Sequence, residues 1–287
     1  MITPLPVAHR SVRRRSGAAL AAALAAGLAC SPAEAGDAAP AAAPWKLSVT
    51  PYAWATSLHG KAGVAGRTAD VDVSFSDLLK NLNGAVMLDL ELRKGRFALM
   101  SDSVYANLED DSSTGQDRIK IDTTANMLIQ GLAATYRVGT WQLAEFDRAG
   151  PLSVAVDPYA GIRYTYLDTE LKGKLDLPNL GVNAKRTAEG DKNWVDPIVG
   201  LRTIWKLGDR LSLLAAADIG GTSQNSDYSW QAIGLVGYRF GLFGTNNANL
   251  LAGYRALHQK YEDGNGRNEF DWDVTIHGPV VGLTIAF

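Results

Sequence analysis

The sequence predicts an all-β protein, an antiparallel transmembrane β-barrel of about ten strands. Three observations support this fold: an export signal at the N-terminus, apolar residues that recur at every second position, and a final amphipathic strand that ends on Phe287. Alternation over segments of about ten residues, separated by turns, is typical of barrels in bacterial outer membranes. In lipid every backbone N–H and C=O needs an internal partner, so a β-sheet that spans a membrane must close on itself.

Residues 1–35 are predicted to be a secretory signal peptide. A short apolar run, residues 17–30, follows a group of four arginines, Arg10, Arg13, Arg14 and Arg15. Ala33-Glu34-Ala35 then provides the small residues of a cleavage site. A lipoprotein signal ending at Cys30 is the alternative, although Gly27-Leu28-Ala29 matches the lipid-attachment motif poorly. The apolar run is too short to span a membrane as a helix.

Cleavage after Ala35 leaves a chain of about 250 residues, which suits one all-β barrel domain. Residues 36–44 are rich in Ala and Pro and are predicted to be a disordered lead-in, and residues 45–287 are predicted to be the barrel. The only cysteine, Cys30, lies in the signal peptide, so the mature chain can form no internal disulfide and no thiolate metal site.

The period-two alternation predicts ten strands. Their ranges are residues 45–58, 83–94, 96–108, 118–138, 152–170, 193–207, 209–220, 228–241, 247–262 and 268–287. Twelve strands would result if residues 61–75 and one segment among 141–151 or 171–187 also crossed the membrane, and eight is a further alternative. We assign residues 61–82 to the first extracellular loop. Within it, Ser76 to Lys80 is predicted to form a capped helical turn.

Short and long links alternate along the chain. Short links lie at Lys94-Gly95 and at residues 207–209, whereas longer polar links lie at residues 109–117, 171–192, 221–227 and 263–269. Outer-membrane barrels have short periplasmic turns and long extracellular loops, so the sequence predicts both termini in the periplasm. Residues 171–192 form the most basic of the predicted extracellular loops.

A Gly-x-Arg repeat recurs in the predicted strands, as Gly161-Ile162-Arg163, Gly200-Leu201-Arg202, Gly237-Tyr238-Arg239 and Gly253-Tyr254-Arg255. In a strand the Gly and Arg share one face and the middle residue points to the other. A lipid-facing arginine near the midplane costs about 2–4 kcal/mol, so the arginines are predicted to face the lumen. The glycines are expected to leave room for the guanidinium groups.

Strand parity predicts a lumen lined by six acids and six bases. The acids are Asp89, Glu91, Asp102, Asp157, Asp196 and Asp218, and the bases are Arg93, Arg137, Arg163, Arg202, Arg239 and Arg255. Charges removed from water need partners, so we expect a cross-strand ion-pair network. Two functions stay open: the network fills a closed structural barrel, or it lines a narrow channel for small polar solutes.

The sequence carries no enzyme, cofactor or metal motif, and we expect no enzymatic activity. The mature chain has three histidines, His59, His258 and His277, and none lies at a spacing from a serine that suggests a nucleophile. His258 is predicted to face outward near the outer interface, and His277 is predicted to face outward unless Gly278-Pro279 forms a bulge. Because a catalytic triad is assembled in space, a lipid or peptide hydrolase with a site at the extracellular rim is the alternative.

Partners follow from the predicted location in the outer membrane. We expect contacts with membrane lipid and lipopolysaccharide, recognition of the strand ending at Phe287 by the barrel-assembly machinery, and small polar solutes in the lumen. A net charge of −2 and the lack of a basic segment interleaved with aromatic residues argue against nucleic-acid binding.

Several segments together resemble a proteobacterial family of small outer-membrane β-barrels, most of them uncharacterised. These segments are Pro51-Tyr52-Ala53-Trp54 with Leu58-His59-Gly60, Val71 to Leu79, Arg93-Lys94-Gly95-Arg96-Phe97, and the Gly-Tyr-Arg strands. His59 stands where this family commonly has an aspartate. The resemblance covers most of the mature chain and implies a barrel and its location, but no particular activity.

Overall fold

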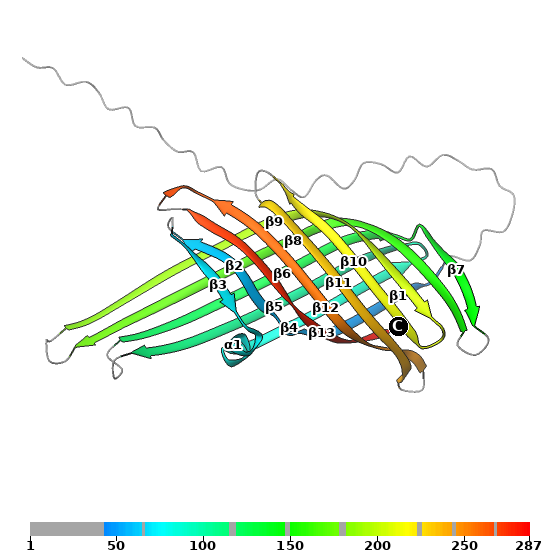
Figure 1. Ribbon diagram of the computed structural model, residues 1–287, viewed down its shortest axis with the longest axis horizontal. Helices are drawn as coiled ribbons and strands as arrows, with labels where there is room; N and C mark the ends of the chain where they lie inside the picture. The colour runs from blue at the N-terminus through cyan, green and yellow to red at the C-terminus, as the bar shows by residue number, and fades with distance from the viewer. Residues whose placement is uncertain are drawn as a thin grey trace, which may run out of the picture. The chain divides into compact units, whose positions relative to one another are not determined.

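The computed structural model describes residues 43–287 except 65–66, 115–118, 147–149, 178–181, 223–225, 243–244 and 267–268. The described residues belong to one compact unit made almost wholly of β-strands (Figure 1). The predicted signal peptide at residues 1–35, and residues 36–42 of the predicted lead-in, lie outside the described residues. Within the described ranges, no helix is long and apolar enough to cross a membrane.

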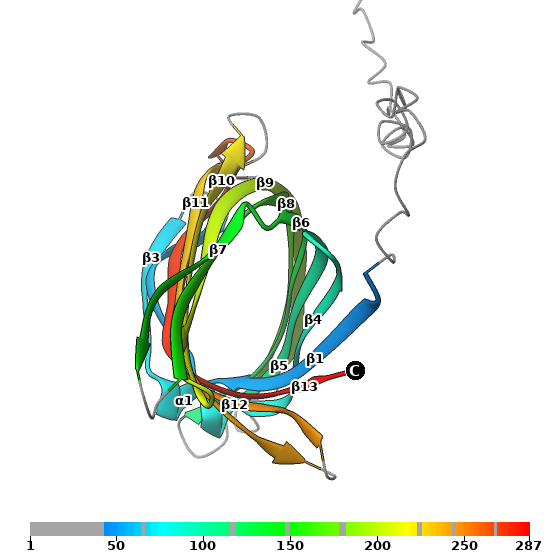
Figure 2. The same cartoon turned by 90° about the vertical axis from the view of Figure 1, so that its right-hand side faces the viewer.

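Ten strands form a closed antiparallel ring, which confirms the predicted fold (Figure 2). In order around the ring they are β1 (Trp45–Trp54), β4 (Leu82–Lys94), β5 (Phe97–Thr114), β6 (Ile119–Tyr136), β8 (Gly150–Leu177), β9 (Val182–Leu207), β10 (Leu211–Thr222), β11 (Ser226–Leu242), β12 (Thr245–Asp263) and β13 (Phe270–Ala286). The first and last strands close the ring, with Ser48 opposite Ala286 and Trp54 opposite Val280.

Three further strands and one short helix extend the ring without adding to it. β2 (Ser57–Val64) continues β1 and pairs with the first half of β13, Phe270 to His277. β3 (Arg67–Val73) pairs with β2 in a hairpin. The helix α1 (Phe75–Lys80) follows and is capped by Ser74, whose side chain accepts from the Asp77 N–H. The segment assigned to the first loop is therefore a hairpin and a helix attached to β13.

The break between β1 and β2 has a local cause on the facing strand. Ala55 and Thr56 lie opposite Gly278 and Pro279, and proline has no N–H to donate to the ladder. The Ala55 N–H still donates to the Pro279 carbonyl oxygen, at 2.9 Å. A Cβ on Gly278 would lie 1.8 Å from the Ala55 carbonyl oxygen, so the two strands touch closely at this point.

The described residues of two segments predicted as loops are strand. In the segment 109–117, β5 continues to Thr114. In the basic segment 171–192, β8 continues to Leu177 and β9 begins at Val182. Figure 1 shows these strands and β6 extending beyond the rest of the sheet. Continuous backbone pairing between β8 and β9, out to Leu177 opposite Val182, outweighs the polar composition that suggested a loop.

The short turns lie where they were predicted. Gly95 and Gly208 have φ values of 59° and 79°, a left-handed conformation that glycine adopts at little cost. The link from β6 to β8 contains β7 (Gly139–Phe146), which pairs with β8 and extends the wall past the end of β6. In the following sections the short-turn end is the end of the barrel at Gly95 and Gly208, and the long-loop end is the opposite one.

Candidate functional site: the barrel lumen

In the Gly-x-Arg repeat the arginine faces the inside of the barrel and the middle residue faces the outside. The middle residues Ile162, Leu201, Tyr238 and Tyr254 are exposed on the outer surface. Arg163 and Arg255 are 2% and 4% exposed and point inward, and Arg202 and Arg239 line the same interior. The parity of the strands thus separates an apolar outer surface from a charged interior.

A first group of charges, the short-turn cluster, consists of Glu91, Arg93, Arg137, Asp157 and Arg202. The Asp157 carboxylate is fully buried and accepts from three arginines, with N···O distances of 3.1 Å to Arg93, 2.8 Å to Arg137 and 3.0 Å to Arg202. Glu91 bridges Arg93 and Arg202, each at 2.7 Å. These ion pairs join β4, β8, β9 and the residue that follows β6 across the lumen.

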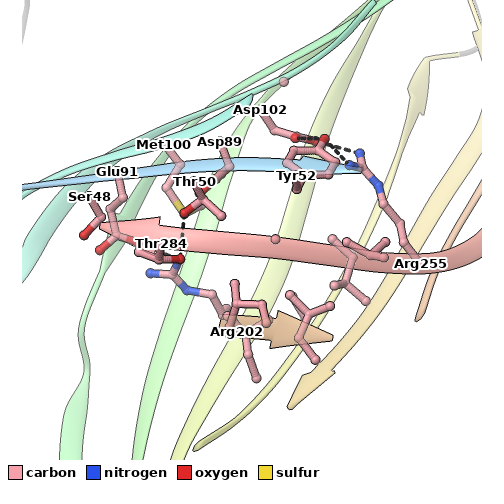
Figure 3. Close-up of a pocket in the computed structure, with 18 of the residues that line it drawn as sticks. Ser48, Thr50, Tyr52, Asp89, Glu91, Met100, Asp102, Arg202, Arg255 and Thr284 are labelled. Atoms are coloured by element: carbon pink, nitrogen blue, oxygen red, sulfur yellow. Dashed lines mark hydrogen bonds and ion pairs between the residues drawn. The ribbon is translucent and has the colours of Figure 1, made fainter. Parts of the chain in front are cut away.

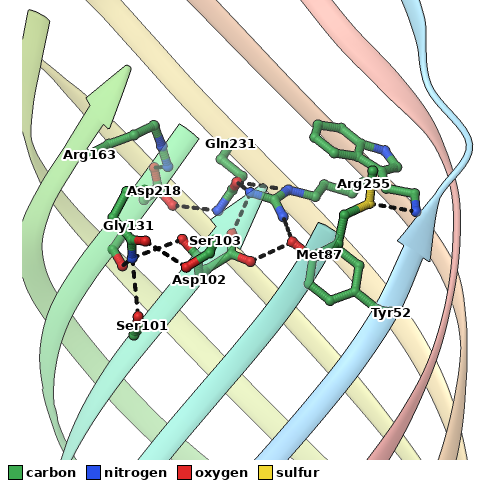
Figure 4. Close-up of polar contacts among 12 residues, drawn as sticks. Tyr52, Met87, Ser101, Asp102, Ser103, Gly131, Arg163, Asp218, Gln231 and Arg255 are labelled. Atoms are coloured by element: carbon green, nitrogen blue, oxygen red, sulfur yellow. Dashed lines mark hydrogen bonds and ion pairs between the residues drawn. The ribbon is translucent and has the colours of Figure 1, made fainter. Parts of the chain in front are cut away.

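A second group, the central polar layer, crosses the lumen nearer the long-loop end (Figure 4). The Arg255 guanidinium contacts Asp102 at 2.6 Å, Tyr52 at 3.0 Å and Gln231 at 2.7 Å. Gln231 in turn donates to Asp218 at 3.1 Å. Asp218 also receives Arg163 at 2.6 Å and the Tyr159 hydroxyl at 2.9 Å, which completes a continuous chain of hydrogen bonds from β1 to β8.

An apolar plug fills the lumen on the long-loop side of the central polar layer. Its members are Trp54, Val104, Ile129, Leu257, Val274 and Ile276, and all of them are buried. Val280 belongs to the same buried cluster but lies on the short-turn side of Arg255. Leu257 and Ile276 face one another on β12 and β13 and are fully enclosed. The Trp54 ring packs against the Arg255 guanidinium, 4.6 Å from ring centroid to Cζ, so the plug rests directly on the polar layer.

A cavity of about 520 Å³ lies between the central polar layer and the short-turn end (Figure 3). One wall is polar and carries Thr50, Tyr52, Asp89, Glu91 and Asp102 from β1, β4 and β5. Strands β10 to β13 contribute apolar side chains, among them Leu214, Ile233 and Leu251, beside polar ones such as Gln231 and Arg239. We call this space the chamber; its mixed lining suits a molecule with both polar and apolar groups.

Basic side chains gather at the short-turn end of the chamber. Lys206 lies close enough to Arg239, Arg137 and Lys46 to interact with their charges. Arg239 also lines the chamber. This group, the basic mouth, gives the short-turn end an excess of positive charge.

Comparison with known proteins supports the fold. No family model and no curated protein matches this sequence. Among solved structures, the outer membrane protease OmpT from Escherichia coli aligns with a TM-score of 0.54 and 10% identity, over 87% of this chain and 99% of that one. The translocator domain of the autotransporter NalP from Neisseria meningitidis aligns with a TM-score of 0.40 and 14% identity, over 85% and 88%.

The fold is that of an outer-membrane β-barrel. In such barrels the short turns face the periplasm and the longer loops face outward. The chamber and the basic mouth lie on the short-turn side of the plug, the side that is predicted to face the periplasm. The central polar layer lies between the chamber and the plug.

Three of the predicted lumen residues have no ion pair within the described chain. Asp89 faces Asp102 across the β4–β5 ladder and lines the chamber. Asp196 lies opposite Arg163 in the β8–β9 ladder, yet Arg163 binds Asp218 instead, and neither buried Asp196 oxygen has a hydrogen-bond partner. Arg239 is exposed at the basic mouth. The expected network thus divides into two clusters and these three separate residues.

The glycines of the repeat have a different role from the one expected. A Cβ on Gly161 or Gly253 would lie 2.0 Å from a carbonyl oxygen of the neighbouring strand. A Cβ on Gly200 would lie 2.4 Å from the Tyr159 ring and 2.7 Å from the Asp218 Cβ. These glycines therefore permit close approach of strands and of the Tyr159 ring, whereas the arginine side chains lie elsewhere in the lumen.

The structure also brings together the three histidines of the described chain, which sequence reasoning treated separately. His59, His258 and His277 lie on the outer surface of β2, β12 and β13, beside Tyr254 and Trp230. The His277 and His59 rings stack with centroids 4.9 Å apart. The convergence depends on β2 pairing with β13, a contact between residues about 220 positions apart that no local pattern encodes.

Proposed function

We propose that this outer-membrane barrel is closed and does not conduct ions in its resting state. The observation that carries the proposal is the pair of barriers stacked in the lumen. The central polar layer joins Tyr52, Asp102, Arg255, Gln231 and Asp218 from wall to wall, and the apolar plug lies directly above it. An interior this small is filled by side chains in other barrels of similar strand number.

The closed state is held by interactions of two kinds. Opening the polar layer would separate Arg255 from Asp102 and leave buried charges without partners. Opening the plug would expose side chains such as Leu257 and Ile276, and the burial of each contributes about 1.5–3 kcal/mol to stability. A solute would have to disrupt both, so we assign the barrel a structural role in which loops and outer surface make the contacts.

The first experiment measures the conductance of the refolded mature chain in a planar lipid bilayer. We expect no discrete current steps, with folding confirmed by heat-dependent gel mobility. As a positive control, replacing Leu257, Ile276 and Arg255 by alanine empties the centre of the plug and breaks the central polar layer, and should produce current steps. Leu250→Ala on the outer surface is the matched control and should stay silent. Current steps from the native chain would contradict the closed barrel.

A second function, a gated path for small anionic solutes, is favoured by the chamber and its basic mouth. Lys46, Arg137, Lys206 and Arg239 would attract anions from the short-turn side, and the chamber would hold them below the plug. If the plug-deleted variant conducts, its reversal potential in a salt gradient should show preference for anions. Lys206→Glu together with Arg239→Glu should then reverse or abolish that preference.

We propose that the barrel is not a hydrolase. Ser57 lies opposite His277 in the β2–β13 ladder, near Asp72, but its Oγ accepts the Phe75 N–H at 3.1 Å. Both ring nitrogens of His277 are held by other partners, Tyr254 and His59. A nucleophile needs a base within hydrogen-bond reach. Ester hydrolysis by the refolded chain should equal that of Ser57→Ala, and a rate that depends on Ser57 would overturn this view.

A further inference from the structure

The outer surface carries a linear chain of hydrogen bonds across four strands. The Tyr254 hydroxyl lies 2.6 Å from His277 Nδ1, and His277 Nε2 lies 3.0 Å from His59 Nδ1. His59 Nε2 in turn lies 2.9 Å from Asp72 Oδ1. The chain thus takes one side chain from each of β12, β13, β2 and β3, in that order. The two imidazoles at its centre each point a nitrogen at the other.

We propose that His59 Nδ1 and His277 Nε2 bind a divalent transition metal ion of the Zn²⁺ class on the outer surface of the barrel. Two imidazole nitrogens bound to one tetrahedral zinc lie about 3.3 Å apart, because each Zn–N distance is about 2.0–2.1 Å. The observed separation of 3.0 Å therefore needs to widen only slightly. Imidazole nitrogen is a preferred ligand of Zn²⁺, Cu²⁺ and Ni²⁺.

The two outer nitrogens of this pair already have the partners that metal-binding histidines require. A ligating histidine almost always donates its other ring N–H to a carboxylate, carbonyl or water, which fixes the tautomer and the ring orientation. Asp72 is this outer partner for His59, and the Tyr254 hydroxyl is the outer partner for His277. Because Asp72 accepts from His59 Nε2–H, the proton between the two rings belongs to His277 Nε2. Metal binding requires that this proton moves to His277 Nδ1, that the tyrosine hydroxyl turns to accept it, and that both rings turn their free nitrogens toward the metal ion.

The pair is accessible from outside the barrel. The side chains of His59 and Asp72 are 50% and 81% exposed. Among the described residues no group of three or more His, Cys, Asp or Glu side chains could hold a metal ion, so the protein supplies two ligands and water supplies the others. Such a site would join the β2–β3 hairpin to β13, the strand that closes the ring.

The third histidine provides a matched control. His258 lies in the same surface patch, but its Nδ1 contacts the Thr275 hydroxyl at 3.1 Å and its Nε2 is 3.9 Å from Asp273. Neither nitrogen faces another imidazole. His258→Gln therefore removes one histidine from the patch and leaves the proposed pair unchanged.

The test titrates Zn²⁺ into the metal-free refolded barrel in detergent, in competition with a chromophoric zinc chelator. We expect one Zn²⁺ per chain. Because His59→Gln or His277→Gln leaves a single protein ligand, each should lower the affinity by more than the roughly 10- to 100-fold that loss of an outer partner costs. Asp72→Asn and Tyr254→Phe should lower it by about 10-fold. His258→Gln should bind as the native chain does.

A second measurement keeps the proposal testable if a variant folds poorly. Cu²⁺ bound to the native barrel should give an electron paramagnetic resonance spectrum with couplings from two imidazole nitrogens. Stoichiometric Zn²⁺ binding by the folded His59→Gln/His277→Gln double variant would overturn the proposal. So would a native chain that binds no Zn²⁺, or a loss of affinity in His258→Gln as large as that in His59→Gln.

Discussion

Replacing Arg255 by methionine is expected to destabilise the barrel by about 3–5 kcal/mol, the usual cost of removing one partner of a buried ion pair. Arg255 is the centre of the central polar layer and donates to Asp102, Tyr52 and Gln231. Without it the Asp102 carboxylate and the Gln231 carbonyl oxygen lose donors inside the lumen. Denaturant unfolding of the refolded barrel in lipid vesicles, followed by tryptophan fluorescence, gives the free energy of unfolding.

Two controls separate this effect from a general loss of charge. Arg239→Met alters the same repeat on β11, but Arg239 is exposed and has no ion pair within the described residues, so the change should stay within about 0.5 kcal/mol. The double variant Arg255→Met/Asp102→Leu removes both charges and should recover much of the loss. Equal effects from Arg239→Met and Arg255→Met would show that the polar layer does not stabilise the fold.

Gly253→Ala is expected to destabilise the barrel by about 3 kcal/mol, because the wall has to move to admit one methyl group. A Cβ at this position would lie 2.0 Å from the Gly234 carbonyl oxygen and 2.8 Å from the Leu235 Cα, both backbone atoms of β11. Backbone within a paired sheet cannot rotate away as a side chain can, so the β11–β12 ladder would have to open or shift.

Gly234→Ala is the matched control on the facing strand. Nothing lies within 4 Å of a Cβ at Gly234, so alanine should be neutral or slightly stabilising. The two variants carry the same chemical change in the same strand pair. The comparison therefore isolates the contact, and a Gly253→Ala barrel as stable as Gly234→Ala would mean that the two strands can separate there at little cost.

The barrel itself could be predicted from the sequence because its main signal is local. Alternation of apolar and polar residues gives the strand, and each strand's parity gives its inner face, as at Arg163 and Ile162. The continuation of β8 to Leu177 and the start of β9 at Val182 could not be predicted, because the Gly, Lys and Asp residues of this segment have low strand propensity. Pairing between the two strands determines that extension.

The inside of the barrel was harder to predict than its wall. Leu257, Val274 and Ile276 lie inside, in strands that are also apolar outside, so alternation alone cannot distinguish a packed lumen from a wet one. Ion-pair partners depend on contacts across the lumen, and Arg163 reaches Asp218 on β10 and not its neighbour Asp196. The histidine pair depends on strand adjacency at the ring closure, which sequence order does not reveal.

The closure of the ring by its first and last strands has a kinetic consequence. Thr50 and Thr284 share a hydrogen bond although they are 234 residues apart, so this seam is among the most non-local contacts of the sheet. Until β13 docks, both β1 and β12 present open edges that other chains could pair with. Contacts of such long range form slowly. Among the ten strands of the ring, β13 is thus the one whose docking ends the period in which the chain is most prone to aggregate.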